Sequence, residues 1–423
     1  MDSSMEYLKE NQATLDAAPS TAIVSTDEAA AAQQEKKAAR SRWPAWFNAF
    51  KQVLPIYISL HLAFLILTYL SALFIIGNFS PRTLRISTLW LAWFRWDSGH
   101  FTAIASNGYD AAWRTAFFPL FPLLQRGVAF LTHDPFIAGL IISNLAGLGM
   151  LVVLYRLVQE DFDAERAFRT VLYLSVFPTA FFFVAAYNES LFLLLTLLSF
   201  YHMRRGNWWL AGLFGLLASL TRSAGIVLFL PFCYEYLRQH QFSIKKVRFT
   251  AVSSLAIPAG LAIFALYCYD KFHDPLSFSH AQVAWDRQLH TPWSGFINSF
   301  RVMFNRHVLS FDSIHNVIDL GACLFILALV VLCFVGPWRF PRAYWVYGIY
   351  AVLIYIFSVI FPIGGSGSVP LGAFSRYMLE VFPAFIVLAS IGKKQWFNLY
   401  YLVLSVSILS FMVLQFVTGR WII

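Results

Sequence analysis

The sequence has little charge. Only 13% of its 423 residues are Asp, Glu, Lys or Arg, whereas 59% are hydrophobic. A water-soluble protein could not cover its surface with so few charged side chains, so lipid must solvate most of this chain. The composition therefore excludes an ordinary soluble domain and predicts an all-α polytopic membrane protein.

Cysteine is also scarce. The four cysteines (Cys233, Cys268, Cys323 and Cys333) lie within or beside apolar segments and have no metal-ligand spacing. Small, buried core residues are the simpler interpretation. No grouping of His, Asp and Glu has metal-ligand spacing either. We therefore expect no bound metal and no cofactor.

The first 44 residues lack the short apolar core and small-residue cleavage site of a secretory signal. They are polar, rich in alanine at 29–32, and then basic. This composition predicts a disordered cytoplasmic tail over 1–44, followed by a single transmembrane domain over 45–423.

Apolar runs in that domain predict about eleven membrane-spanning helices. They lie at roughly 53–77, 136–155, 170–186, 189–203, 208–221, 224–237, 250–269, 316–336, 344–361, 378–391 and 397–418. With the N-terminus in the cytoplasm, most of the 31 Lys and Arg residues fall in the inner loops, although the outer loops are longer. Membrane orientation therefore accounts for the net charge of +9, and we expect no nucleic-acid partner.

Two further apolar stretches are better explained as helices lying on the outer membrane surface. Residues 81–96 place their large apolar side chains at helical spacing, and residues 117–130 are short and interrupted by Pro119 and Pro122. Both belong to a long first outer loop, 78–135. A second large outer loop covers 270–315.

The two runs at 170–186 and 189–203 are too short to cross a hydrocarbon core of about 30 Å. We expect their outer ends to stop below the membrane surface, where polar groups would line a water-filled depression. The predicted topology brings the unusual polar residues to this outer side, namely Asp97, His100, Asn188, Glu189, Arg222, Arg376 and Tyr377.

Asp97 has two interpretations. A carboxylate beside a bilayer is costly unless it is used or paired, which favours a catalytic role at this interfacial position. The alternative is an ordinary loop acid that pairs with Arg95 or Arg114. His100, three residues later, is more often a hydrogen-bonding scaffold residue than an acid or base in such a setting.

The other polar residues have structural alternatives too. Glu189 would suit the first turn of a helix because of the helix dipole, and this role is as plausible as a chemical one. Arg222 could simply extend its head group to the interface. Arg376 lies in an equivalent position, however, and two such arginines could hold one anion.

Arginines that bind an anion, together with a carboxylate that accepts a proton, suit the transfer of a group from a lipid phosphate. The chief alternative is a lipid or glycolipid transporter or flippase. Such proteins usually contain internal repeats and place their charges at the membrane midplane. A membrane acyltransferase, or a structural subunit of a glycosylation complex, also remains open.

Several short motifs, taken in order, are similar to those of one family. The sequence resembles the GPI mannosyltransferase II (PIG-V) family, as a bacterial-type relative, in these motifs: Trp96-Asp97-Ser98-Gly99-His100-Phe101, residues 105–109 and 117–124, Phe177-Pro178-Thr179-Ala180-Phe181-Phe182, Tyr187-Asn188-Glu189-Ser190-Leu191-Phe192, Leu220-Thr221-Arg222-Ser223-Ala224-Gly225, and Ser375-Arg376-Tyr377 followed by Phe382-Pro383. The likeness is strongest over 90–235.

The resemblance implies a glycosyltransferase of the GT-C superfold that uses dolichyl- or undecaprenyl-phosphate mannose and inverts the anomeric centre. It implies that Asp97 is the general base. The acceptor would be a glycan, a lipid or a protein, in a bacterial cell membrane or, in a eukaryote, in the endoplasmic reticulum membrane. In the resulting hypothesis Arg222 and Arg376 hold the donor phosphate, while Asn188 and Glu189 position sugar hydroxyls. His100 and Tyr377 complete the predicted substrate contacts.

Overall fold

The computed structural model describes residues 21–76, 85–305, 310–363 and 369–420. Within these ranges the chain is helical, apart from loops and one isolated antiparallel bridge between Arg287 and Ile363. The predicted all-α membrane fold is confirmed. The chain divides into two units, residues 1–51 and 52–423, and the first long helix, α2 (Thr21–Ile76), runs through the division.

The first half of the chain contains both short and long helices. In chain order they are α3 (Ile86–Leu91), α4 (Asp97–Asn107), η1 (Ala112–Ala116), α5 (Leu120–Thr132), α6 (Pro135–Asp161), α7 (Ala164–Ser175), η2 (Ala180–Phe183), α8 (Glu189–Arg204), α9 (Trp208–Thr221), η3 (Ser223–Leu228) and α10 (Phe229–Gln239).

The second half alternates long helices with short ones. It contains η4 (Ile244–Lys246), η5 (Phe249–Leu255), α11 (Ala256–Phe272), α12 (Ser277–His280), η6 (Ala281–Trp285), α13 (Ser294–Asn305), α14 (Phe311–Leu332), η7 (Arg342–Tyr344), α15 (Trp345–Val359), α16 (Phe374–Tyr377), η8 (Met378–Glu380), α17 (Phe382–Ile391) and α18 (Gln395–Val417).

Six helices among the described residues are long and apolar enough to cross a membrane. They are Pro44–Leu73, Pro135–Asp161, Phe249–Phe272, Ser313–Leu332, Arg342–Val359 and Gln395–Val417. A seventh would be the pair Phe374–Glu380 and Phe382–Ile391, which is bent by 81°. The protein is therefore a multi-pass membrane protein, and the count of eleven spans stays a prediction.

The predicted span at 170–186 is not a continuous helix. α7 ends at Ser175, and the chain then runs through an irregular, buried segment to the start of α8 at Glu189. Pro178 lies in this segment and cannot donate a backbone hydrogen bond. Irregular backbone is tolerated at membrane depth because protein, rather than lipid, surrounds it.

The first outer loop contains one helix more than the sequence indicates. α3 covers the middle of the predicted helix at 81–96, of which residues 81–84 lie outside the described part, and α5 matches the one predicted at 117–130. Phe130 and Leu131 on α5 are 78% and 85% exposed, as expected of a helix that contacts lipid. Between them lies α4, which begins at Asp97.

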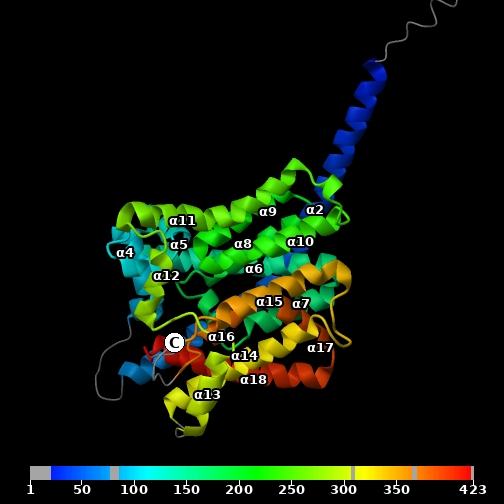
Figure 1. The fold of residues 1–423 in the computed structure, drawn as a ribbon. Coiled ribbons are helices and arrows are strands. Elements are labelled where there is room, and N and C mark those ends of the chain that lie inside the picture. The colour runs from blue at the N-terminus through cyan, green and yellow to red at the C-terminus, as the bar shows by residue number, and fades with distance from the viewer. Residues whose placement is uncertain (1–20, 77–84, 306–309, 364–368, 421–423) are drawn as a thin grey trace, which may run out of the picture. The chain divides into compact units, whose positions relative to one another are not determined.

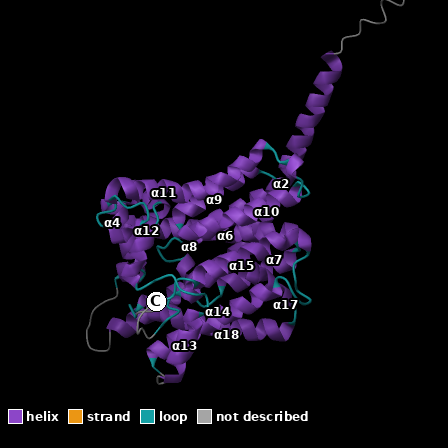
Figure 2. Ribbon diagram, viewed as in Figure 1, coloured by secondary structure: helices purple, strands orange, loops and turns teal. Residues whose placement is uncertain are grey.

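Within residues 52–423, helices that are far apart along the chain pack against one another. α6 packs between α7 and α8, α9 packs between α8 and α11, and α7 also contacts α17 (Figures 1 and 2). An aromatic cluster that includes Trp93, Phe182, Tyr187 and Phe416 joins the first outer loop to the break after α7 and to α18. The start of α4 is thereby fixed against the centre of the protein.

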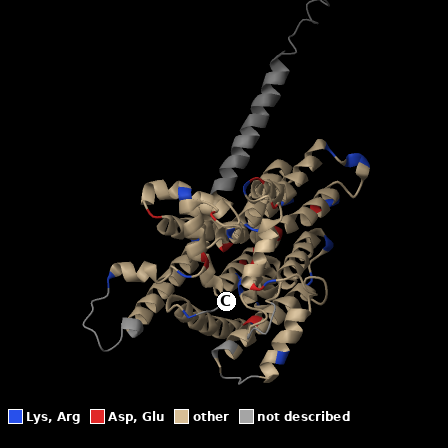
Figure 3. Cartoon of the chain, turned by 60° about the vertical axis from the view of Figure 1, so that its left-hand side comes forward, with Lys and Arg blue, Asp and Glu red and all other residues tan. Residues whose placement is uncertain are grey.

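Charged positions are sparse along these helices, as Figure 3 shows. One group of them lies where α6 and α8 end. Arg204 donates to Asp161 at 2.8 Å and to Glu235, which is fully buried, at 2.9 Å. Arg238 also donates to Glu235 at 2.7 Å. The positive-inside rule places this group at the cytoplasmic side.

The predicted topology can be tested by cysteine labelling. Asn107 and Lys394 are both exposed, and Figure 1 shows α4 and the turn between α17 and α18 at opposite ends of the helices. With Cys233 replaced by serine, a membrane-impermeant maleimide should label Asn107→Cys only from the outer side. It should label Lys394→Cys only after the membrane is opened. Labelling of both from the same side would contradict the topology.

The buried ion group should contribute strongly to stability. Glu235→Gln would leave Arg238 without its acid and Arg204 with Asp161 alone, so one positive charge of the group would be uncompensated. We expect a loss of about 3 kcal/mol, measured as a lower melting temperature in detergent. Glu160→Gln is the matched control, because Glu160 is 31% exposed and pairs with Arg205 near the surface. Its effect should stay below about 1 kcal/mol. Equal melting temperatures for the two variants would contradict a structural role for Glu235.

Candidate active site

A cavity of about 340 Å³ opens at the helix ends for which the sequence predicts the outer side of the membrane. Its lining combines a charged side with an aromatic side. The charged side contains Asp97, Asn188, Arg222, Arg287, Arg376, Tyr377 and Glu380, and the aromatic side contains Phe117, Phe118, Phe278 and Trp285. Five of the seven residues predicted as site residues therefore line one cavity, although they come from four separate parts of the chain.

Asp97 is held in place by its own neighbours. Trp96 adopts a positive φ of 42°, which turns the chain so that α4 begins at Asp97. The Ser98 hydroxyl bridges the backbone N–H and carbonyl of Arg95, and Arg95 donates to the Val417 carbonyl at 2.9 Å. A strained residue of this kind persists only where the surrounding contacts over-determine it, and such residues cluster at functional sites.

Glu189 lies at the end of the buried irregular segment. It is the first residue of α8, where the helix dipole stabilises a carboxylate, and it is 1% exposed. The segment before it is fastened by the Ser143 hydroxyl, which donates to the Tyr187 carbonyl, and by the Asn188 amide, which donates to the Thr221 carbonyl. Glu189 therefore lies at the start of a helix, and it is not among the residues that line the cavity.

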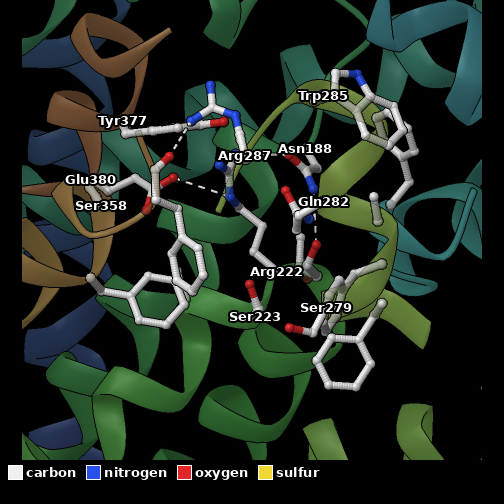
Figure 4. A pocket seen from close by; sticks show the side chains of 18 of the residues that line it. Asn188, Arg222, Ser223, Ser279, Gln282, Trp285, Arg287, Ser358, Tyr377 and Glu380 are labelled. Atoms are coloured by element: carbon white, nitrogen blue, oxygen red, sulfur yellow. Dashed lines mark hydrogen bonds and ion pairs between the residues drawn. The ribbon is translucent and has the colours of Figure 1, made fainter. Parts of the chain in front are cut away.

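Arg222 follows α9 in an extended conformation, with φ −153° and ψ 145°. This backbone turns away from the helix because Gly225 packs against the end of α9. A Cβ at Gly225 would lie 2.4 Å from the Ser219 nitrogen, so only glycine fits. The extended residue directs the Arg222 side chain into the cavity, where Figure 4 shows it between Glu380 and Asn188.

Arg376 comes from the short helix α16, which starts after another strained residue, Ala373, with φ 70°. Its guanidinium is almost wholly buried and lies over the rings of Phe182 and Tyr187, at 4.8 and 4.6 Å from their centroids. These contacts fix the plane of the guanidinium. Arg376, on the bent pair of helices Phe374–Glu380 and Phe382–Ile391, therefore holds its guanidinium in a fixed position at the centre of the site.

The charged residues form a linear arrangement of alternating sign, which we call the charge chain: Asp97, Arg376, Glu189, Arg222 and Glu380. Arg376 donates through Nη1 to Asp97 at 2.6 Å and through Nε to Glu189 at 2.5 Å. Arg222 donates through Nη1 to Glu189 at 2.6 Å, and its Nε lies 3.1 Å from Glu380 Oε1.

The charge chain excludes one early alternative for Asp97. Neither Arg95 nor Arg114 pairs with it: Arg95 binds backbone carbonyls, and Arg114 pairs with Asp110 at 3.0 Å. Arg376 contacts only Oδ2 of Asp97, and within the described residues Oδ1 accepts no hydrogen bond. Asp97 therefore offers one oxygen to the cavity.

His100 does not line the cavity. Its ring packs against Trp113, Phe117 and Trp285, with centroid distances of 5.3, 4.9 and 6.1 Å. Burial lowers the pKa of the imidazole, while the Asp97 carboxylate opposes this shift and Arg114 adds to it. A neutral His100 that supports the aromatic wall fits this position better than a direct substrate contact.

The structure adds two charged residues that the sequence predictions omitted. Glu380 lies four residues after Arg376, and this spacing in an apolar region was an available signal. Arg287 comes from the second outer loop and is 8% exposed. It looked like one of many polar loop residues, because no local pattern shows that its loop folds back onto the site.

The sequence model of the mannosyltransferase (PIG-V) family matches residues 71–294, a little over half of the chain. GPI mannosyltransferase 2 of Cryptococcus neoformans is 34% identical over 144 residues, which cover 31% of this chain and 34% of that protein. GPI alpha-1,6-mannosyltransferase 2 of Rattus norvegicus is 33% identical over 144 residues, covering 31% and 29%. The matched part thus spans about a third of the length of these relatives.

Among solved structures, ArnT from Cupriavidus metallidurans bound to undecaprenyl phosphate aligns with a TM-score of 0.49 and 14% identity. The alignment covers 79% of this chain and 75% of that one. The family match includes Asp97, Glu189, Arg222 and Arg287 and confirms the resemblance found in the motifs. The protein belongs to the mannosyltransferase (PIG-V) family.

Proposed function

We propose that this protein is an inverting glycosyltransferase of the GT-C type. It moves a mannosyl residue from a polyprenyl-phosphate donor to an acceptor hydroxyl at the outer face of the membrane, with Asp97 as the general base. The family supports sugar transfer, and the charged cavity among the outer helix ends supplies a place for it. Dolichyl- and undecaprenyl-phosphate mannose are the donors that the resemblance implies.

The observation that carries the proposal is the position of Asp97. Two carboxylates of the described residues line the cavity, and the side chain of Asp97 is 20% exposed whereas that of Glu380 is 3% exposed. A general base must come within hydrogen-bond reach of the proton it removes. Asp97 meets this condition through its free Oδ1, and Glu380 is enclosed beside Arg222.

In the proposed step the acceptor oxygen attacks the anomeric carbon from the side opposite the phosphate. A new C–O bond forms as the C–O bond to the phosphate breaks, and its electron pair remains on the phosphate oxygen. The acceptor hydroxyl proton passes to Asp97 Oδ1. The products are a mannosylated acceptor and a polyprenyl phosphate that carries one more negative charge than it did in the donor.

Arg376 would act as a positioning residue for this base. The hydrogen bond from Arg376 to Oδ2 orients the Asp97 carboxylate. The hydrogen bond to Glu189 and the contacts with two aromatic rings hold Arg376 in place when the substrate binds. Asp97 also begins α4, where the helix dipole favours the ionised carboxylate that a base requires. The base is thus ready before the acceptor arrives.

The opposite side of the cavity suits a sugar ring. Trp285 and Phe117 lie edge to face at 5.4 Å, and Gln282 and Ser279 present polar groups beside them (Figure 4). Asn188 and Tyr377 lie on the charged side. We place the acceptor between the aromatic wall and Asp97, so that its hydroxyl faces Oδ1.

The relatives named above are eukaryotic GPI mannosyltransferases. This favours the endoplasmic reticulum membrane over the bacterial cell membrane, and a glycan carried by a lipid as the acceptor. The cytoplasmic location of the N-terminus belongs to the same proposal, because it follows from the charge bias of the loops.

Replacing the base should abolish turnover without loss of the fold. Asp97→Asn keeps the shape of the side chain but removes proton acceptance, so we expect the transfer of radiolabelled mannose from polyprenyl-phosphate mannose to fall about 10²- to 10⁴-fold. Folding should survive, because Arg376 retains Glu189 as its partner. The purified protein, with a membrane lipid extract as acceptor source, provides the assay.

Glu380→Gln is the control for this experiment, since Glu380 is the other carboxylate on the cavity wall. A greater loss of turnover in Glu380→Gln than in Asp97→Asn would move the role of base to Glu380. Normal turnover in Asp97→Asn would refute the proposed mechanism. A flippase would instead move labelled lipid across the bilayer and form no mannosylated product.

A further inference from the structure

We propose that Arg287 forms the binding site for the donor phosphate, in place of Arg222 and Arg376. The inference rests on the proposed function for the identity of the donor. Its evidence is the distribution of charge around the cavity, and the ligand class is an isoprenyl phosphate whose headgroup reaches the outer ends of the helices.

The charge chain is unsuited to hold an anion by itself. It contains two arginines and three carboxylates, and both arginines are bound to carboxylates on their inner sides. A phosphate brought to these arginines would approach three carboxylates at the same time, and their repulsion would offset part of its attraction to the two arginines.

Arg287 is held differently. Its Nη1 donates to the Phe361 carbonyl at 3.0 Å, and its Nη2 donates to the Gly372 carbonyl at 2.7 Å. Among the described residues it forms no ion pair with an acid. The buried acid Asp319 on α14 is close enough to interact electrostatically with Arg287, but its carboxylate accepts from the Ser375 backbone N–H and is not in ion-pair contact with the guanidinium. A guanidinium has five N–H groups, so donors remain after the two backbone bonds.

The surroundings of Arg287 make it a rigid part of the cavity. The backbone bridge to Ile363 fastens its loop to the chain that follows α15, and the His290 N–H donates to the Ile360 carbonyl at 2.9 Å. The guanidinium lies over the rings of Phe374 and Tyr377, 5.4 Å from each centroid. A fixed, nearly buried cation that is not in ion-pair contact with a carboxylate is suited to an anionic headgroup.

Tyr377 separates this cation from the charge chain. Its ring faces Arg287 at 5.4 Å and Arg222 at 5.2 Å, so it lies between the two guanidinium groups (Figure 4). A phosphate on Arg287 would thus be near Arg222 without displacing Glu189 or Glu380. Phe357 and Phe361 line the same end of the cavity and offer an apolar surface to the first isoprene unit.

The test uses citronellyl phosphate, a short isoprenyl phosphate, and citronellol, which has the same chain without the phosphate. Binding to the purified full-length protein is measured by the rise in melting temperature with ligand concentration. Arg287→Gln removes the charge while its amide can still donate to one carbonyl. We expect its dissociation constant for citronellyl phosphate to increase about tenfold to a hundredfold.

The matched control is Arg301→Gln. Arg301 is exposed on α13 in the same outer loop and contacts only the Asn298 side chain at 3.5 Å. This variant should bind citronellyl phosphate like the unmodified protein. Citronellol should bind all three proteins equally, because it lacks the group that Arg287 recognises. Unchanged affinity for citronellyl phosphate in Arg287→Gln would overturn the assignment.

A second measurement does not depend on the folding of a variant. Phenylglyoxal modifies the arginines that it can reach, which for Arg287 means through the cavity that this residue lines, and mass spectrometry locates the modified positions. Citronellyl phosphate should protect Arg287, whereas Arg301 should be modified with or without the ligand. Equal modification of Arg287 in both conditions would also overturn the assignment.

These results are separable from the proposed transferase activity. If Arg287 governs phosphate binding but the unmodified protein transfers no mannose, the proposed function fails and the anion site stands. If mannose transfer is normal in Arg287→Gln, with an unchanged KM for the donor, the anion site fails and the function stands.

Discussion

The site depends on the double attachment of Arg376. Placing three carboxylates and two guanidinium groups among apolar helices would be prohibitive if any one of them stood alone. Arg376 connects the acid of the first outer loop with the acid that begins α8, and Glu189 in turn connects it with Arg222. Each charge is thereby balanced by a neighbour that comes from a different part of the chain.

This arrangement explains why the helices are interrupted where they are. A continuous helix would leave Glu189, Arg222 and Arg376 on separate cylinders with their side chains at fixed angles. The irregular segment before α8, the extended conformation of Arg222 and the bend between α16 and α17 bring the three side chains to one point. The ion pairs compensate for the helical hydrogen bonds that these interruptions give up, and surrounding protein keeps lipid away from the exposed backbone.

Apolar runs and loop charges were sufficient to predict one side and one depth for Asp97, Glu189, Arg222 and Arg376. The ion pairs of the structure show that the four side chains also meet. Their partners were not predictable, because pairing depends on how α4, α8, α9 and α16 pack. The phosphate clamp of Arg222 and Arg376 stays a prediction, and the sequence did not show that each arginine is paired with carboxylates.

Two other features were hidden for related reasons. α4 was missed because its apolar residues are few and its start depends on the strained Trp96, which distant contacts stabilise. Arg287 was missed because its loop is fixed by a bridge to Ile363, a contact between segments far apart in the sequence. In both cases the position of the segment depends on a tertiary contact, which the periodicity of the sequence does not indicate.

The proposed reaction moves one negative charge from Asp97 to the released phosphate and leaves the total charge of these groups unchanged. Before transfer, the charge chain carries one excess negative charge, Arg287 one positive charge, and the donor phosphodiester one negative charge. When Asp97 takes the proton the charge chain becomes neutral, and the released phosphate gains the negative charge that Asp97 loses. The total within the cavity is unchanged, and the new charge develops on the side where Arg287 lies. A site in a low-dielectric surrounding benefits from such a balance, because a charge moved between fixed partners needs little rearrangement of its surroundings.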